Sequence, residues 1–330
     1  MILRSRSLDA IKEEISLHRD FFDRVHKVRQ AVRGYNNVAL DERGESGSRV
    51  RAMLAAAPGR RTFNLLAQGD SWFDYPIGTD IIDCLHANHG HSITNIAVAG
   101  STLNDEAYGP VPSEMFGLPM GFKQSDDPSR IAELVRRIQQ DKPQALLLSA
   151  GGNDIAGDEF FNFINNAESG LTSVNQEVLD GVINSTFSNA YTFLINMSIA
   201  AAADAGLRNM VIFTHGYDYP WPDGRGVIAF LGWRIGPWFD ASLNQKNYPN
   251  NNARDLRVRH DIVAKFIDSL NTMLAGLVKN YPGKVFHVDL TNTLKSEHDW
   301  ANELHPSNSG FSALANKIDA ALQAFVPSEP

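Results

Sequence analysis

Short apolar segments alternate with long helical patterns along most of this chain. The apolar segments, each bounded by turn residues, lie at residues 62–67, 92–98, 145–150, 210–214 and 284–290. Apolar residues with helical spacing fill the stretches at about residues 129–140, 174–205, 254–280 and 308–325. Connections of that length favour parallel strands with helices on both faces of the sheet. The sequence therefore predicts a three-layer α/β/α sandwich around a doubly wound, mainly parallel five-stranded sheet.

The first 60 residues precede this alternation. Apolar residues spaced three and four apart between residues 8 and 33 predict an amphipathic helix. Residues 41–60 carry glycines among charged side chains, which is typical of a connector, although residues 50–57 could hold a short helix. We expect residues 1–60 to form an N-terminal helical extension and connector, and residues 61–330 to form the main domain.

One long segment of the main domain, residues 217–252, has no clear periodicity. It contains Trp221, Trp233 and Trp238, three of the five tryptophans of the chain. Long stretches of this kind are usually functional or disordered, and the aromatic residues argue against disorder. We expect an aromatic lid over a binding site, with a packed excursion at the sheet edge as the alternative.

Composition excludes several classes of function. The chain has 30 Lys and Arg against 38 Asp and Glu, a net charge of −8, so it lacks the positive field that attracts nucleic acid. The single cysteine, Cys84, can form neither an internal disulfide nor a thiolate metal cage, and it is predicted to be an inert core residue. No stretch approaches the roughly 20 apolar residues of a membrane span, and no export signal is visible. We expect a soluble, cytoplasmic protein.

Polar residues follow the predicted strands. Ser71, Gly100, Asn153 and His215 come after successive strands, and His305 precedes the last helix. In doubly wound sheets ligands bind beyond the carboxyl ends of the strands, so these residues should converge. A serine nucleophile needs a positioned base, for which His305 is the candidate, and the oxyanion that it generates needs N–H donors, for which Gly100 and Asn153 are candidates.

Short sequence motifs surround these residues in a characteristic order. They are Gly69-Asp70-Ser71, the segment Asn95 to Gly100, Gly151-Gly152-Asn153-Asp154, and His305-Pro306 followed by Gly310-Phe311. In this order they resemble the four blocks of the SGNH hydrolases, in the GDSL esterase and lipase superfamily, over about residues 62–325. The resemblance implies that Ser71 is the nucleophile and His305 the base. It also implies that the oxyanion hole comprises the backbone N–H groups of Ser71 and Gly100 and the side chain of Asn153, without a metal or cofactor.

Two positions depart from the family pattern. Asn302 stands three residues before the histidine, where the family has aspartate. Asn302 could orient His305 through its carbonyl oxygen, Asp299 could do so if its loop folds back, and an unassisted Ser–His dyad or a distant acid is a further alternative. Glu303 is expected to point away from the ring.

The second departure is Trp72, which replaces the leucine of the GDSL motif. It begins an extension, Trp-Phe-Asp-Tyr-Pro, that predicts an aromatic wall near the nucleophile. We expect Trp72, His215 and Trp221 to be candidate substrate contacts. His215 is alternatively explained as a buried histidine bonded to the backbone.

A cluster of histidines, His86, His89 and His91, suggests a metal site at first sight. No acidic or cysteine partner stands nearby at ligand spacing, so a solvated helix end is the favoured interpretation.

These observations predict a serine ester hydrolase that acts through an acyl-enzyme on a small or medium acyl ester. A thioesterase or a carbohydrate O-acetyl esterase would use the same machinery. Asn302 keeps open a further alternative, a family member that binds an acyl or glycan ligand without turnover.

Overall fold

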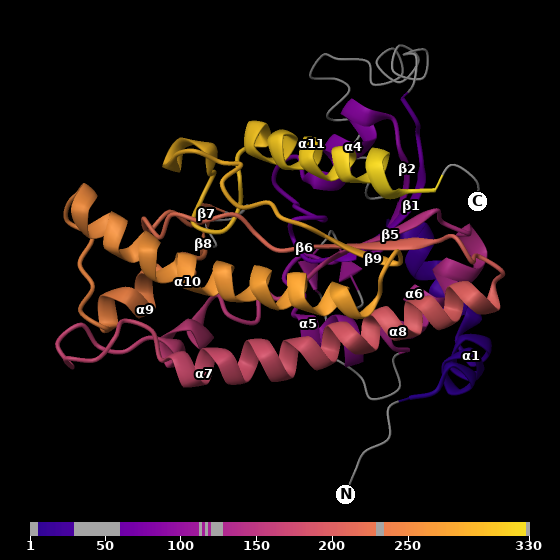
Figure 1. Cartoon of the computed structure of the whole chain (residues 1–330), viewed down its shortest axis with the longest axis horizontal. Coiled ribbons are helices and arrows are strands. Elements are labelled where there is room, and N and C mark those ends of the chain that lie inside the picture. Colours follow the sequence, from indigo (N-terminus) through magenta and orange to yellow (C-terminus); the bar gives the residue numbers. More distant parts are fainter. Residues whose placement is uncertain are drawn as a thin grey trace, which may run out of the picture.

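The computed structural model describes residues 6–29, 60–111, 114–115, 118–119, 128–228 and 234–327. At its centre is a five-stranded sheet in the order β2-β1-β5-β6-β9, with every neighbouring pair parallel (Figure 1). The strands are β1 Asn64–Gly69, β2 Ser92–Asn95, β5 Ala145–Ser149, β6 Val211–His215 and β9 Val285–Val288. All five predicted strands are present. The chain passes from β1 outward to β2 and then back across β1 to β5, so the switch point of the sheet lies between β1 and β5.

Helices cover both faces of the sheet, which confirms the predicted three-layer fold (Figure 1). On one face α4, Ile81–His89, packs against α11, Asn308–Phe325. On the other face lie α5 Leu103–Tyr108, α6 Arg130–Asp141, α8 Ser188–Asp204 and α10 Ala253–Leu277. Every residue of β5 and β6 is buried between these layers. Burial on both faces is the reason that these strands appear in the sequence as continuous apolar runs.

The helices begin at side-chain caps that the sequence supplies. Asp80, Ser129, Asn252 and Ser307 accept hydrogen bonds from backbone N–H groups in the first turns of α4, α6, α10 and α11. The long helix expected at residues 174–205 is three consecutive pieces: α7 Gln176–Gly181, a π-helical turn η2 Val182–Phe187, and α8.

Several short elements lie outside the central sheet. They are α9 Asp240–Gln245, the hairpins β3 Glu114–Met115 with β4 Leu118–Pro119 and β7 Val227–Ile228 with β8 Arg234–Ile235, and the 3₁₀ turns η1 Asp158–Phe163, η4 Val278–Asn280 and η5 Glu297–Asp299. The hairpin β7–β8 and α9 fall within residues 217–252. Trp233 of that segment and the expected connector at residues 41–59 lie outside the described residues.

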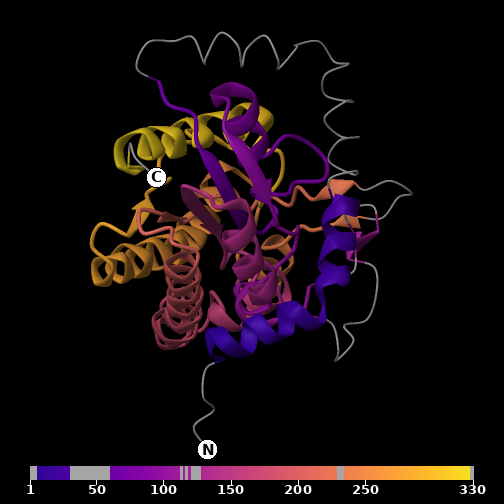
Figure 2. The same ribbon diagram turned by 90° about the vertical axis from the view of Figure 1, so that its right-hand side faces the viewer.

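The N-terminal extension packs against the main domain. The helix expected at residues 8–33 is interrupted: α1 spans Leu8–Leu17, and a second helix covers residues 19–29 after a turn at His18, while residues 30–33 lie outside the described residues. Both run along one side of the domain (Figure 2). Arg29 forms a buried ion pair of 2.7 Å with Glu133 of α6, and Asp23 pairs with Arg136 of the same helix. Within the described residues, no helix combines the length and the apolar character that a membrane crossing requires.

Candidate active site

The candidate nucleophile stands in a tight turn at the end of β1. Asp70 holds this turn, because its Oδ1 accepts a hydrogen bond from the Trp72 backbone N–H at 2.9 Å. Gly69 permits the close approach of β5, since a Cβ at this position would lie 2.8 Å from the Cβ of Ser149. Ser71 is only 6% exposed. The turn therefore fixes the serine at the carboxyl edge of the sheet, beneath a cover of other side chains.

Ser71, His305 and Asn302 form a hydrogen-bonded chain. His305 Nε2 lies 2.8 Å from Ser71 Oγ, and His305 Nδ1 lies 3.0 Å from Asn302 Oδ1. Asn302 Oδ1 also accepts the backbone N–H groups of Leu304 and His305, so it is an acceptor in this arrangement. His305 Nδ1 must then carry the ring proton, and Nε2 is left to accept the proton of Ser71. This is the tautomer that a general base requires.

Burial determines the protonation state of His305 in this hydrogen-bonded array. His305 is 5% exposed, and desolvation lowers its pKa to about 3. No carboxylate contacts the His305 ring among the described residues. The imidazole is therefore neutral near pH 7 and ready to accept a proton.

The other candidate orienters of the histidine have different partners. Asp299 Oδ2 accepts the backbone N–H groups of Lys295 and Ser296 and closes the turn before η5. Glu303 points away from the ring, as the sequence predicts, and accepts N–H groups from residues 224–239. Of these three side chains, Asn302 is the one that contacts the histidine.

The candidate oxyanion donors lie on the loops that follow β2 and β5. Gly100 has a φ of +79°, a left-handed conformation that favours glycine. Asn153 Nδ2 donates to Ser101 O at 2.9 Å, which joins the two loops. An amide nitrogen carries two hydrogens, and this bond uses one of them. The structure therefore brings Gly100 and Asn153 to neighbouring positions at the edge where Ser71 also stands.

Two aromatic residues that the sequence analysis did not single out as site residues flank His305. Tyr75 stacks on the imidazole, with ring centroids 4.4 Å apart, and its hydroxyl accepts a hydrogen bond of 3.2 Å from Asn302 Nδ2. Trp238 meets the imidazole edge-on, with centroids 5.3 Å apart. Tyr75 belongs to the aromatic extension after Ser71 and Trp238 to the expected lid. The sequence shows that both segments are rich in aromatic residues, but it does not show that they contact His305.

Two of the residues expected to contact substrate are buried beside the site. Trp72 is 2% exposed, donates from Nε1 to Leu304 O at 3.0 Å, and lines an apolar cavity next to Ser71. His215 is also buried, hydrogen-bonds the Gly216 carbonyl from Nδ1, and has a pKa lowered by burial to about 4. Trp221 packs against His260 of α10, with centroids 4.2 Å apart.

Buried carboxyl groups brace the loops below the candidate nucleophile. Asp70 Oδ2 accepts the hydroxyl of Tyr217, and desolvation raises the pKa of Asp70 to about 6. Asp154 accepts the Leu103 N–H at 2.7 Å, and burial likewise raises its pKa to about 6. Both residues hold loop backbone in place through these hydrogen bonds.

An apolar cavity of about 30 Å³ adjoins the same loops. Its lining includes Trp72, Gly152 and Leu304, which are the sequence neighbours of Ser71, Asn153 and His305. Apolar residues of α10 complete its wall. A space of this size with such a lining suits a short alkyl group better than water.

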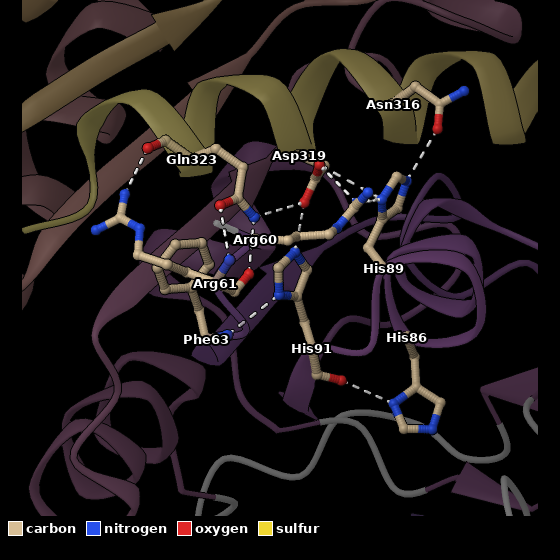
Figure 3. Close-up of polar contacts among 9 residues, drawn as sticks. All are labelled: Arg60, Arg61, Phe63, His86, His89, His91, Asn316, Asp319 and Gln323. Atoms are coloured by element: carbon tan, nitrogen blue, oxygen red, sulfur yellow. Dashed lines mark hydrogen bonds and ion pairs between the residues drawn. The ribbon is translucent and has the colours of Figure 1, made fainter. Parts of the chain in front are cut away.

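The histidine cluster is a buried polar network and not a solvated helix end, so that prediction is wrong (Figure 3). His91 is 0% exposed; its Nδ1 accepts the Phe63 N–H and its Nε2 donates to Asp319 Oδ1 at 2.9 Å. His89 hydrogen-bonds Asn316 at 2.9 Å, and Arg60 pairs with Asp319. The acidic partner comes from α11, 228 residues away, and its approach could not be inferred from local spacing.

These histidines do not form a metal site. His86 turns to the backbone carbonyl of His91, while His89 and His91 use separate oxygens of the Asp319 carboxylate (Figure 3). In the part of the chain that the structure describes, no group of three or more His, Cys, Asp or Glu side chains is arranged to hold a metal ion.

Comparison with known proteins gives a family match. The family described as GDSL-like Lipase/Acylhydrolase matches residues 31–318. No curated protein matches the chain.

Similar folds occur among solved structures. An extracellular lipase from Streptomyces rimosus is 12% identical with a TM-score of 0.46, over 79% of this chain and 100% of the other. A carbohydrate esterase family 3 protein from Talaromyces cellulolyticus is 12% identical with a TM-score of 0.41, over 80% and 97%. The periplasmic domain of a lipopolysaccharide acetyltransferase from Salmonella ser. Paratyphi A is also 12% identical, with a TM-score of 0.41, over 80% and 84%. At this identity the likeness concerns the fold alone.

Proposed function

This chain belongs to the GDSL-like lipase/acylhydrolase family and is therefore a hydrolase, and we propose that it cleaves a small or medium acyl ester through an acyl-enzyme on Ser71. The observation that carries the proposal is the chain of contacts from Ser71 Oγ through His305 to Asn302, with distances of 2.8 and 3.0 Å. These are hydrogen-bonding distances for a nucleophile, its base and an orienting group. The small apolar cavity beside the site supports a short acyl group.

The reaction would proceed in two halves. His305 Nε2 removes the proton of Ser71 as Oγ attacks the ester carbonyl, and the negative oxygen is stabilised by the N–H groups of Ser71 and Gly100 and by Asn153. The C–O bond to the alcohol then breaks, and His305 returns the proton to the departing alcohol oxygen. Water repeats the sequence on the acyl-enzyme, which releases the carboxylic acid and restores Ser71. No redox partner or metal is needed for this balance.

Asn302 holds the histidine without contributing a charge. Its Oδ1 fixes the tautomer, and the amide cannot flip without losing the hydrogen bonds that Oδ1 accepts from the backbone N–H groups of Leu304 and His305. This favours catalysis over a binding-only role, because a protein that only binds its ligand does not need a correctly oriented general base. A thioester substrate would be attacked by the same groups.

The test is the loss of turnover and of covalent labelling in Ser71→Ala. Wild type, Ser71→Ala and the control Ser169→Ala, which alters an exposed serine in a distant turn, are compared with acetyl and butyryl esters and acetyl thioesters. A serine-reactive phosphonate is applied to each, and labelled peptides are identified by mass spectrometry. We expect turnover and one label in wild type and control, and neither in Ser71→Ala.

Two outcomes contradict the proposal. A folded Ser71→Ala protein with undiminished turnover removes Ser71 from the chemistry. A folded wild type that neither turns over these substrates nor accepts the phosphonate favours the binding-only alternative. Faster turnover of thioesters than of matched oxygen esters assigns the enzyme to the thioesterase alternative.

A further inference from the structure

Glu303 is a fully buried carboxylate with partners in one distant segment. Oε1 accepts the Gly224 N–H at 2.9 Å, and Oε2 accepts the N–H groups of Trp238 and Phe239 at 2.7 and 2.8 Å. Its own backbone N–H donates to Arg225 O at 3.1 Å. Residues 224–225 and 238–239 are therefore attached to the loop that carries His305, two residues from the imidazole.

The charge state of Glu303 reflects two opposing effects. Burial raises its pKa to about 7, while the backbone N–H groups that it accepts favour the ionised form. A buried carboxylate is costly unless hydrogen bonds satisfy it, and here both oxygens are satisfied by main-chain donors. The arrangement needs an acceptor-only side chain of this length.

Trp238 is the residue that this attachment fixes most firmly. Its N–H is held by Glu303, and its carbonyl accepts the Gly157 N–H at 3.0 Å. The indole lies on Gly236, where a Cβ would come within 2.7 Å of the ring. The backbone of Trp238 is thus held on both sides and its ring is backed by a glycine. Trp238 is only partly buried, and its ring meets His305 in a T-shaped contact.

The chemistry of ester hydrolysis indicates which part of the substrate lies next to His305 and Trp238. His305 Nε2 gives its proton to the departing alcohol oxygen, so the alcohol group must sit next to the imidazole. Tyr75 stacks on the imidazole, and Trp238 meets it in a T-shaped contact. A partly exposed indole held rigidly at this place provides a flat apolar surface for the alcohol group.

We propose that Trp238 forms the wall of the alcohol subsite and that Glu303 is the positioning residue that holds it there. The proposal rests on the proposed ester hydrolysis and names its substrate class. The preferred esters have an alcohol with a flat apolar face, which is the shared chemistry of an aryl group and of a sugar ring. Glu303 acts through Trp238 and does not touch the reacting atoms.

The experiment compares acetyl esters that differ only in the alcohol. Ethyl acetate has no flat face, phenyl acetate has an aromatic one, and a methyl glucoside monoacetate has a sugar face. Variants Trp238→Leu, Trp238→Phe and Glu303→Gln are compared with the control Trp221→Leu, which removes an indole of the same region that packs on His260. Near-UV circular dichroism and thermal unfolding establish that each variant is folded.

We expect Trp238→Leu to raise KM about tenfold for esters with a flat face, from the loss of one ring contact and its buried area. For ethyl acetate, which has no flat face, KM should change much less than for the other two esters, and any change in kcat from the lost contact with His305 should be the same for all three esters. Glu303→Gln should raise the same KM values. Its NH2 group would face backbone N–H groups that need an acceptor, so Trp238 would be held less firmly. Trp238→Phe should retain part of the preference, and Trp221→Leu should retain all of it. The aryl and sugar arms distinguish the two kinds of alcohol.

Other outcomes overturn the proposal. Equal losses for all three esters in Trp238→Leu, or an equally large loss of preference in Trp221→Leu, remove the special role of Trp238. An unchanged preference in a folded Glu303→Gln removes the positioning role.

A binding measurement separates this proposal from the proposed function. Phenol and methyl glucoside are tested by ligand-observed NMR against Ser71→Ala, with and without Trp238→Leu. A wild type that hydrolyses none of the esters refutes the hydrolase proposal, whereas binding that depends on Trp238 still supports the subsite. Absence of such binding overturns the subsite.

Discussion

Asn302→Asp would place a carboxylate 3.0 Å from His305 Nδ1 without changing the size of the side chain. The remaining contacts can be kept. The new Oδ1 accepts the same N–H groups of Leu304 and His305, and the Tyr75 hydroxyl, which accepts from Asn302 Nδ2 in the native protein, can turn and donate to the second oxygen. The substitution therefore changes the charge beside the base and little else.

The expected size of the effect follows from the pKa of the base. Burial holds the pKa of His305 at about 3. An opposite charge within about 4–6 Å raises a histidine pKa by about 1–3 units, which brings it to about 4–6. Each unit corresponds to about 1.4 kcal/mol of imidazolium stabilisation. Only part of that charge has developed in the transition state, so kcat/KM at pH 7 should rise between a few-fold and about a hundredfold.

Asn302→Asp should raise the rate at pH 7 but should also make the enzyme lose activity at a higher pH on the acid side. The base must be neutral in the free enzyme, and raising its pKa makes it protonate at higher pH. The acidic limb of kcat/KM should therefore move from about pH 3 in the native protein to about pH 4–6 in Asn302→Asp.

The assay measures kcat/KM from pH 3 to 8 with an ester whose alcohol does not titrate in this range. Protein is held at pH 7 and diluted into each buffer immediately before the initial rate is taken. Asn162→Asp, which adds the same charge at an exposed position, controls for net charge. A native acidic limb near the ordinary histidine pKa of about 6.5, or identical limbs in native protein and Asn302→Asp, would refute the reasoning.

Further predictions concern single side chains. Asn153→Ala should lower kcat about 100- to 1,000-fold with little change in KM, and a change in KM alone would make it a ground-state contact. Tyr75→Phe keeps the ring that stacks on His305 but removes the acceptor of Asn302, so kcat should fall about tenfold while the thermal midpoint changes little. His215→Phe should flatten the dependence of stability on pH. Because the folded pKa of His215 is about 4, the unfolded chain binds the proton more tightly, and up to about 3 kcal/mol of native stability is lost as pH falls from about 6.5 to 4; urea unfolding at pH 4.5 and 7 should show a smaller difference in the variant.

The strands and the order of the site residues could be predicted because their signals are local. The inner strands β1, β5 and β6 are buried on both faces, so each is a short apolar run between turn residues. The carboxyl ends of parallel strands meet at one edge, and this predicts that Ser71, Gly100 and Asn153 lie close together. Position three before His305 was enough to nominate Asn302, and it is the side chain that contacts the ring.

Contacts between segments far apart in the chain could not be predicted in this way. Trp72 directly follows the serine, yet it turns into the core, because its indole N–H finds a partner in the Leu304 carbonyl, 232 residues away. His91 looks like a surface histidine until α11 brings Asp319 over the end of α4 (Figure 3). In both cases the deciding partner comes from the C-terminal fifth of the chain, and sequence spacing carries no information about its approach.

The orientation of the Asn302 amide also depends on contacts that the sequence does not reveal, and this orientation determines which nitrogen of His305 carries the proton. An asparagine can present either its oxygen or its nitrogen to an imidazole, and only the oxygen leaves Nε2 free to accept a proton. The sequence gives no preference between the two. In the structure the preference comes from the backbone N–H groups of Leu304 and His305, which require the oxygen on their side; the Tyr75 hydroxyl, which can donate or accept, then accepts from the nitrogen on the other side. A neutral amide can therefore replace the usual carboxylate as an orienter because its surroundings, and not its own charge, select the productive tautomer.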